Sequence, residues 1–359
     1  MPGTPEADIS AVFLAQADRL FGRHAPEQVG PDQGWNEELW QAVEAAGFPL
    51  ALVTEEAGGA GLSMLDVARL LRRSAYHNAA LPLGETAIAA ALWTAAGGSL
   101  VPGAITLAPG QSPDRLAVSR ADGKFVVNGT ARRVPWGSVA GSILVFACDE
   151  KGRGHLALVD ADAASLTRKT VRNLAGEPRD TLAFSGVVVD DDRLRRAPEI
   201  LDEAGLRPYG AFLRAQQMVG GMERCLDHAL GYANERQQFG RPLAKFQAVQ
   251  HMLAVAAGHF AAASALADAA AESYGTADFA LDTALAKARC GEAAGKVAEI
   301  CHQVHGAMGF AQEHPLHRAS LRLWSWREEF GGEAEWQEYV GRLVCRNGGD
   351  QLWPMLARR

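Results

Sequence analysis

The chain has 359 residues, a formal net charge of −7, and a composition that is 48% hydrophobic and 21% charged. This length is enough for two or three packed units with a large buried core. The acidic balance argues against a general nucleic-acid binder. With no apolar run of roughly 18 residues and no basic, apolar leader, we expect a cytoplasmic protein without a membrane segment. Five isolated cysteines indicate buried thiols rather than a disulfide framework or a metal site.

Residues 1–102 have the pattern of an N-terminal helical domain. Apolar residues recur at helical spacing over 9–21, 35–46 and 62–71, and an alanine-rich helix is predicted over 85–96. A glycine-rich loop precedes the third of these helices.

Residues 103–196 change to the short period of β-strands. Two apolar runs flank Asp122-Gly123, a hairpin signal. Further short strands are expected at 143–147, 156–159 and 182–189. Their spacing is typical of a β-barrel or sandwich.

Residues 197–359 return to the helical period. Apolar residues from Leu243 to Leu266 line one face of a long predicted helix, and 277–306 form another. The high alanine content favours closely packed helices, as in a four-helix bundle. The predicted fold is therefore mostly α with a small β domain in the middle, and a ligand is expected between the units.

Two C-terminal motifs resemble those of the acyl-CoA dehydrogenase family. Glu235–Leu243 reads ERQQFGRPL and Lys245–His251 reads KFQAVQH, similar to the family pattern ERxQFGxPxxxFQxxQ. Gln303–Phe310, QVHGAMGF, resembles QxxGGxGF, and Gly58–Ser63 is a weaker third match. The motifs occur in family order, and the likeness extends over essentially the whole chain. It implies an acyl-CoA dehydrogenase-like fold, the cofactor FAD and an acyl-CoA substrate.

The chemistry of these motifs suits FAD. A guanidinium binds a pyrophosphate through forked, charge-assisted hydrogen bonds, and a glycine lets the backbone approach a ligand closely. The resemblance implies that Arg236 meets the FAD of a neighbouring subunit and that Gln303 and Gly306 hold its pyrophosphate. The resemblance also implies that four further residues face the cofactor: Gln238, Phe239, Phe246 and Gln247. Trp136 is either core or part of the flavin site.

The catalytic base of the family has no clear counterpart. Members remove the α-proton of the thioester with a carboxylate and pass the β-hydrogen to flavin. Family spacing places Phe330 at the usual glutamate position and Gly210 at the alternative one. Glu329 is the candidate base if the loop shifts by a residue or two, with Glu328 beside it; otherwise both are surface carboxylates. A flavin-binding segment of the family, TEPxxGSD, keeps only its proline in 106–113.

The sequence is compatible with three functions. The first is the partner subunit of a heteromeric α2β2 tetramer, resembling bacterial enzymes that act on fatty acids or steroid side chains. It requires a second acyl-CoA dehydrogenase-like subunit, and the family usually passes its electrons to an electron-transferring flavoprotein. The second is a self-sufficient homo-oligomeric dehydrogenase with a relocated base. The third is a non-catalytic helical protein that keeps the fold for binding or assembly.

Overall fold

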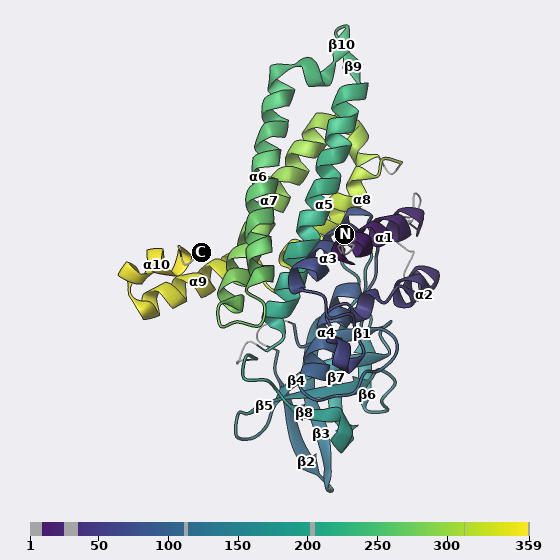
Figure 1. Ribbon diagram of the computed structural model, residues 1–359, viewed down its shortest axis with the longest axis vertical. Coiled ribbons are helices and arrows are strands. Elements are labelled where there is room, and N and C mark those ends of the chain that lie inside the picture. The colour runs from purple at the N-terminus through teal and green to yellow at the C-terminus, as the bar shows by residue number, and fades with distance from the viewer. Residues whose placement is uncertain (1–8, 25–34, 111–113, 202–204, 312, 358–359) are drawn as a thin grey trace, which may run out of the picture.

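The computed structural model describes residues 9–24, 35–110, 114–201, 205–311 and 313–357. Figure 1 shows three units along the long axis: the sheet at one end, a long helical bundle at the other, and the N-terminal helices beside their junction. The predicted fold class, mostly α with a small β domain between two helical parts, is confirmed.

The N-terminal helices are α1 (Ile9–His24), α2 (Glu37–Ala45), α3 (Met64–Tyr76) and α4 (Leu83–Ala95). A side-chain cap begins α2, because Asn36 accepts a hydrogen bond from the Leu39 backbone, and Ser63 caps α3 in the same way. Helix α4 is buried on nearly all sides, which explains its alanine-rich, almost uncharged sequence.

The glycine-rich loop before α3 has a packing reason for its composition. A side-chain carbon added at Gly59 would lie 2.2 Å from the carbonyl oxygen of Val53, which leaves no room for another residue. The loop therefore needs no ligand to explain this glycine.

The middle domain is an eight-stranded sheet with the order β6-β7-β3-β2-β4-β5-β8, in which β1 pairs parallel to β4. The hairpin between β2 and β3 turns at Asp122 and Gly123, both with positive φ, as their sequence predicts. The strands are β1 (Ile105–Ala108), β2 (Leu116–Ala121), β3 (Lys124–Pro135), β4 (Ser142–Cys148), β5 (Gly154–Asp160), β6 (Leu166–Lys169), β7 (Arg179–Val189) and β8 (Leu194–Arg196).

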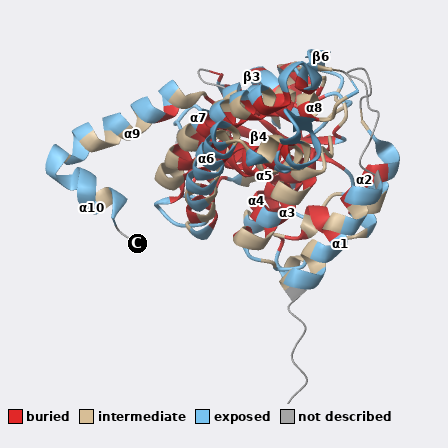
Figure 2. Cartoon of the chain, turned by 90° about the horizontal axis from the view of Figure 1, so that it is seen from above, coloured by how far each residue is buried: buried red, intermediate tan, exposed pale blue. Residues whose placement is uncertain are grey.

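Helices α5 (Arg207–Glu235), α6 (Gln247–Glu272), α7 (Phe279–His305) and α8 (Leu316–Glu328) form the bundle. The helix expected from Leu243 begins later, at Gln247, because Leu243–Lys245 form a separate 3₁₀ turn. Beyond the bundle, α9 (Glu333–Asn347) and α10 (Leu352–Leu356) project as an arm, largely exposed in Figure 2.

The expectation that no segment is long and apolar enough to cross a membrane does not hold for helix α6. By length and composition alone it is apolar enough to cross one, with a mean hydropathy of 1.4 over its most apolar 18 residues, of which 28% are buried. Its alanines explain this value. Ala256, Ala263 and Ala267 are fully buried in the main core of the chain, so α6 is a bundle helix with one exposed face.

Candidate functional site

The motif that follows α5 forms the outer tip of the bundle. A short hairpin, β9 (Gln237–Gln238) paired with β10 (Arg241–Pro242), stands at the top of Figure 1. Both residues of its turn, Phe239 and Gly240, have positive φ, the turn type that two-residue hairpins favour. This turn leaves the Phe239 side chain 92% exposed.

Arg236 joins α5 to this hairpin. Its backbone N–H donates to the Tyr232 carbonyl at 2.8 Å, and its own carbonyl accepts from the Leu243 N–H at 2.9 Å. These bonds fix the backbone, while the exposed side chain forms no ion pair with any described residue. The guanidinium is therefore available to an anion from outside the chain.

The aromatic residue of the second half of the motif supports the hairpin. The Phe246 ring lies 4.2 Å below the Arg241 guanidinium and 6.2 Å from the Phe239 ring, in an edge-to-face arrangement. Gln238 and Gln247 are both exposed.

The second motif ends α7 at the same end of the bundle. Gly306 has φ 60° and ψ −143°, a conformation that essentially only glycine adopts. It starts a 3₁₀ turn, Gly306–Phe310. The His305 ring stacks on Tyr232 of α5 at 4.6 Å, which places this turn beside the last turns of α5. Gln303 next to it is exposed.

The two motifs give this end of the bundle an exposed apolar and cationic surface, which we call the tip. Met308 is 54% exposed and Phe310 71%, in addition to Phe239. Exposed apolar groups that gather in one region mark a binding surface. With the Arg236 guanidinium, which has no ion-pair partner among the described residues, the tip presents apolar and cationic groups of the kind that bind a phosphorylated, aromatic ligand.

Trp136 does not join the tip. It lies in the middle domain and is only 3% exposed, with its ring centroid 5.8 Å from the Arg179 guanidinium. The other seven predicted flavin-binding residues all lie on the two tip motifs.

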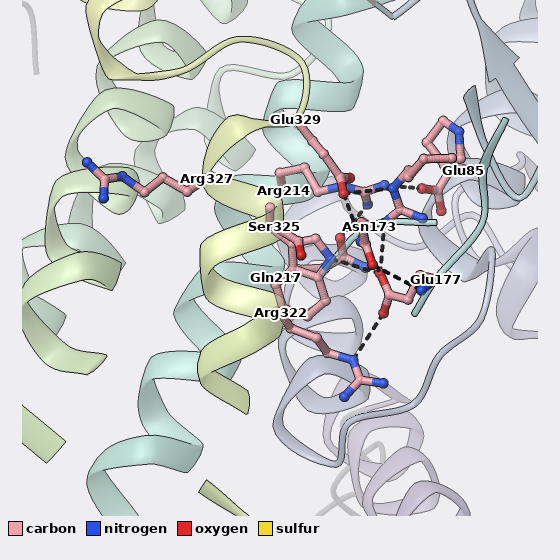
Figure 3. A network of polar contacts seen from close by, with 12 residues as sticks. Glu85, Asn173, Glu177, Arg214, Gln217, Arg322, Ser325, Arg327 and Glu329 are labelled. Atoms are coloured by element: carbon pink, nitrogen blue, oxygen red, sulfur yellow. Dashed lines mark hydrogen bonds and ion pairs between the residues drawn. The ribbon is translucent and has the colours of Figure 1, made fainter. Parts of the chain in front are cut away.

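A cluster of buried charges lies where the three units meet (Figure 3). Arg214 of α5 is 1% exposed. Its Nη2 lies 2.7 Å from Oε1 of Glu85 on α4, and its Nε lies 2.5 Å from Oε2 of Glu329 after α8. Arg179 of β7 approaches the other oxygen of Glu329 at 2.7 Å.

Glu177 and Arg322 complete the charge cluster. Glu177 accepts from Arg179 at 2.7 Å and from Arg322 Nε at 3.0 Å, and the amide of Asn173 donates to both Glu177 and Glu329. Three carboxylates thus face three guanidiniums, so the formal charges cancel. Balanced pairing of this kind is what makes buried charges tolerable.

This environment argues against Glu329 as the catalytic base. Burial alone would raise the pKa of Glu329, but the attraction of Arg179 and Arg214 outweighs it and lowers the pKa to about 2. A carboxylate held so firmly in its ionised form is a poor proton acceptor at neutral pH. Glu328 beside it is exposed at the end of α8. Glu329 is therefore better explained as a structural anion.

The two positions at which the family places its base lie against each other. Phe330 is 1% exposed, and a side-chain carbon added at Gly210 would lie 2.1 Å from its ring. One added at Gly110 would lie 2.3 Å from the same ring. The two positions that family spacing picked out separately are thus neighbours in space, and neither has a carboxylate. Of the eroded flavin-binding segment, residues 111–113 lie outside the described residues.

Sequence reasoning missed most of the charge cluster. Glu85, Arg179 and Arg322 belong to no motif, and Glu85 is 129 positions from its partner Arg214. One signal was present: Glu85 and Arg214 each interrupt an otherwise apolar helical stretch. A single charge in such a stretch needs a buried partner.

Comparisons with known proteins agree with these observations. Residues 208–337 match the family model described as acyl-CoA dehydrogenase, C-terminal domain. The chain is 28% identical to the acyl-CoA dehydrogenase IpdE2 of Mycobacterium tuberculosis over 296 residues, which are 80% of each protein.

Solved structures show the same fold. One is a chain of the ChsE4-ChsE5 complex from Mycobacterium tuberculosis, with a TM-score of 0.82, 24% identity and coverage of 96% of this chain and 98% of that one. Another is butyryl-CoA dehydrogenase from Megasphaera elsdenii, with a TM-score of 0.84, 20% identity and coverage of 96% and 100%. Residues 208–337 thus match the C-terminal domain of the acyl-CoA dehydrogenase family, and the chain as a whole is similar to acyl-CoA dehydrogenases, enzymes that use FAD.

Proposed function

We propose that this chain is the partner subunit of a heteromeric, FAD-dependent acyl-CoA dehydrogenase. Its tip completes a flavin site that a second acyl-CoA dehydrogenase-like chain holds, in an α2β2 assembly. The observation that carries the proposal is the exposed tip: Arg236 has no ion-pair partner among the described residues, and Phe239 is 92% exposed. The likeness to a chain from a two-protein complex supports this reading.

The chemistry supplied by FAD in this family is acceptance of the β-hydrogen of the thioester as hydride. The contribution of this chain is to binding. The Arg236 guanidinium neutralises pyrophosphate charge by charge-assisted hydrogen bonds, and the glycine at 306 allows close approach of the backbone. Phe239 covers apolar cofactor surface from water. The base that takes the α-proton belongs to the second chain, and an electron-transferring flavoprotein is the proposed acceptor.

The other two functions are less well supported. A self-sufficient dehydrogenase needs a base in this chain, and Glu329 is held as an anion between two arginines. A protein that only binds or assembles would have no need for the tip motifs. Both remain alternatives that flavin measurements separate.

The visible absorption spectrum tests the proposal directly. The chain purified alone is expected to be colourless, and co-purification with any acyl-CoA dehydrogenase-like chain encoded beside it is expected to give a yellow complex. Yellow lone protein would favour the self-sufficient enzyme. A complex without flavin would reject the proposal.

A substitution locates the contact. Arg236→Ala is expected to lower the flavin content of the complex without changing the melting temperature of the lone chain. Arg23→Ala is the matched control, because Arg23 is also an exposed arginine but lies on α1. Equal flavin content in both variants would remove Arg236 from the site.

A further inference from the structure

Phe330 is the residue that family spacing assigns to the position of the catalytic glutamate. Its ring contacts Gly110 of the segment after β1 and Gly210 of α5 so closely that neither position has room for a side chain. The Arg214 guanidinium lies 5.4 Å from the ring centroid. The ring therefore bridges the middle domain, the bundle and the charge cluster.

The backbone around Phe330 is held in a conformation that phenylalanine rarely adopts. Phe330 has φ 57° and Gly331 φ 101°. A bulky residue keeps a positive φ only where its surroundings fix it. The carbonyl of Phe330 accepts from Trp336 Nε1 at 3.1 Å, and Nζ of the buried Lys287 donates to the carbonyls of Arg327 and Gly331 at 2.7 and 2.8 Å.

These contacts fix the ring in place rather than leaving it free to swing out. A flexible side chain on a relaxed loop would not need a buried lysine and a tryptophan N–H to hold its turn. The charge cluster beside it is equally closed, because its guanidiniums are already paired with carboxylates. Two described atoms of the cluster lack a hydrogen-bond partner, Glu85 Oε2 and Arg179 Nε. The first is an acceptor, whereas a thioester oxygen needs donors, and the second already forms an ion pair with Glu329 at 2.7 Å.

We propose that Phe330 is a plug that closes this chain's own counterpart of the acyl-CoA and flavin site, and that the neighbouring charge cluster replaces the ligand as the bridge between the three units. This rests on the proposed function, in which each flavin lies between one such chain and one catalytic chain, and adds that this chain's own site takes neither ligand. Each pair of one such chain and one catalytic chain binds a single FAD and a single acyl-CoA.

Binding to the lone chain tests the plug without any partner. Isothermal titration of the purified chain with butyryl-CoA, and separately with FAD, is expected to show no saturable binding at one site per chain. Saturable one-to-one binding of either probe would overturn the proposal. In the assembled complex, one FAD per two chains is the expected ratio, and one FAD per chain would overturn it. A colourless complex would reject the proposed function, whereas the titrations of the lone chain would still show whether Phe330 closes its site.

A cavity variant tests the ring itself. Phe330→Gly removes the ring at a position whose φ suits glycine, and the apolar space left behind is expected to take up toluene. Toluene should then raise the melting temperature of Phe330→Gly but not that of the wild type. An equal shift in both would show that the wild type already has an open pocket. No shift in either would show that the ring seals no closed space; both results contradict the plug. Phe330→Ala repeats the test if the glycine variant does not fold.

Discussion

Replacing Glu329 by glutamine separates a structural from a catalytic role for this carboxylate. The substitution keeps the shape of the side chain and removes its charge. In the wild type, Oε1 lies 2.7 Å from Arg179 Nε and Oε2 lies 2.5 Å from Arg214 Nε. A glutamine can accept a hydrogen bond from one of these arginines, but its NH₂ group then faces the other. We therefore expect the variant to be less stable.

The size of the effect follows from the pKa and the burial. The pKa of Glu329 falls from 4.5 to about 2, and at ~1.4 kcal/mol per unit this corresponds to roughly 3 kcal/mol of stability at pH 7. Removing one partner of a buried ion pair costs about 3–5 kcal/mol. An unfolding entropy of ~2 cal/mol/K per residue, summed over the 359 residues, converts this loss to a decrease in Tm of about 4–7 °C.

Thermal unfolding at pH 7 measures this decrease, with Glu328→Gln as the matched control. Glu328 is the adjacent glutamate and is exposed, so its substitution should change stability by no more than about 0.5 kcal/mol. Because the folded-state pKa of Glu329 is lowered, its contribution is complete above pH 4.5 and is lost as the pH falls towards 2. The difference between wild type and Glu329→Gln should shrink over that window. An unchanged Tm together with abolished turnover of the assembled enzyme would refute this reasoning and identify Glu329 as the base.

Three further changes test other parts of the structure. Glu85→Gln leaves Arg214 with one fewer buried anion and should lower the free energy of unfolding by about 3 kcal/mol in urea titrations; an unchanged midpoint would contradict the charge cluster. Phe239→Ala should leave the Tm of the lone chain unchanged but reduce flavin retention in the assembled complex, and full retention would exclude Phe239 from the interface. Burial, Arg224 and neighbouring histidines lower the pKa of His228 to about 4. The unfolded chain therefore binds more protons than the folded chain between pH 6.5 and 4, so stability should decrease as the pH is lowered through that window. The decrease should be less steep in His228→Asn.

Local sequence patterns determined the elements and the tip. The turn at Asp122-Gly123 follows from residues that tolerate positive φ, and the bundle helices follow from apolar spacing. Each tip motif is contiguous in sequence, so the structure keeps Gln238 and Phe239 on one hairpin and Arg236 directly before it. Their exposure in the lone chain could not be predicted, because burial depends on which other segments and chains pack against them.

Which side chains meet in the interior became clear only from the tertiary structure. Spacing placed Phe330 and Gly210 at the two base positions, but the chain had to fold before the ring could be seen to fill the space beside Gly210. The same holds for Glu329, whose neighbours in sequence left it open as a base or a surface charge. Its two arginines come from β7 and α5. Propensity and periodicity act over a few residues, whereas the pKa of a buried carboxylate is set by charges that distant segments bring within about 3 Å.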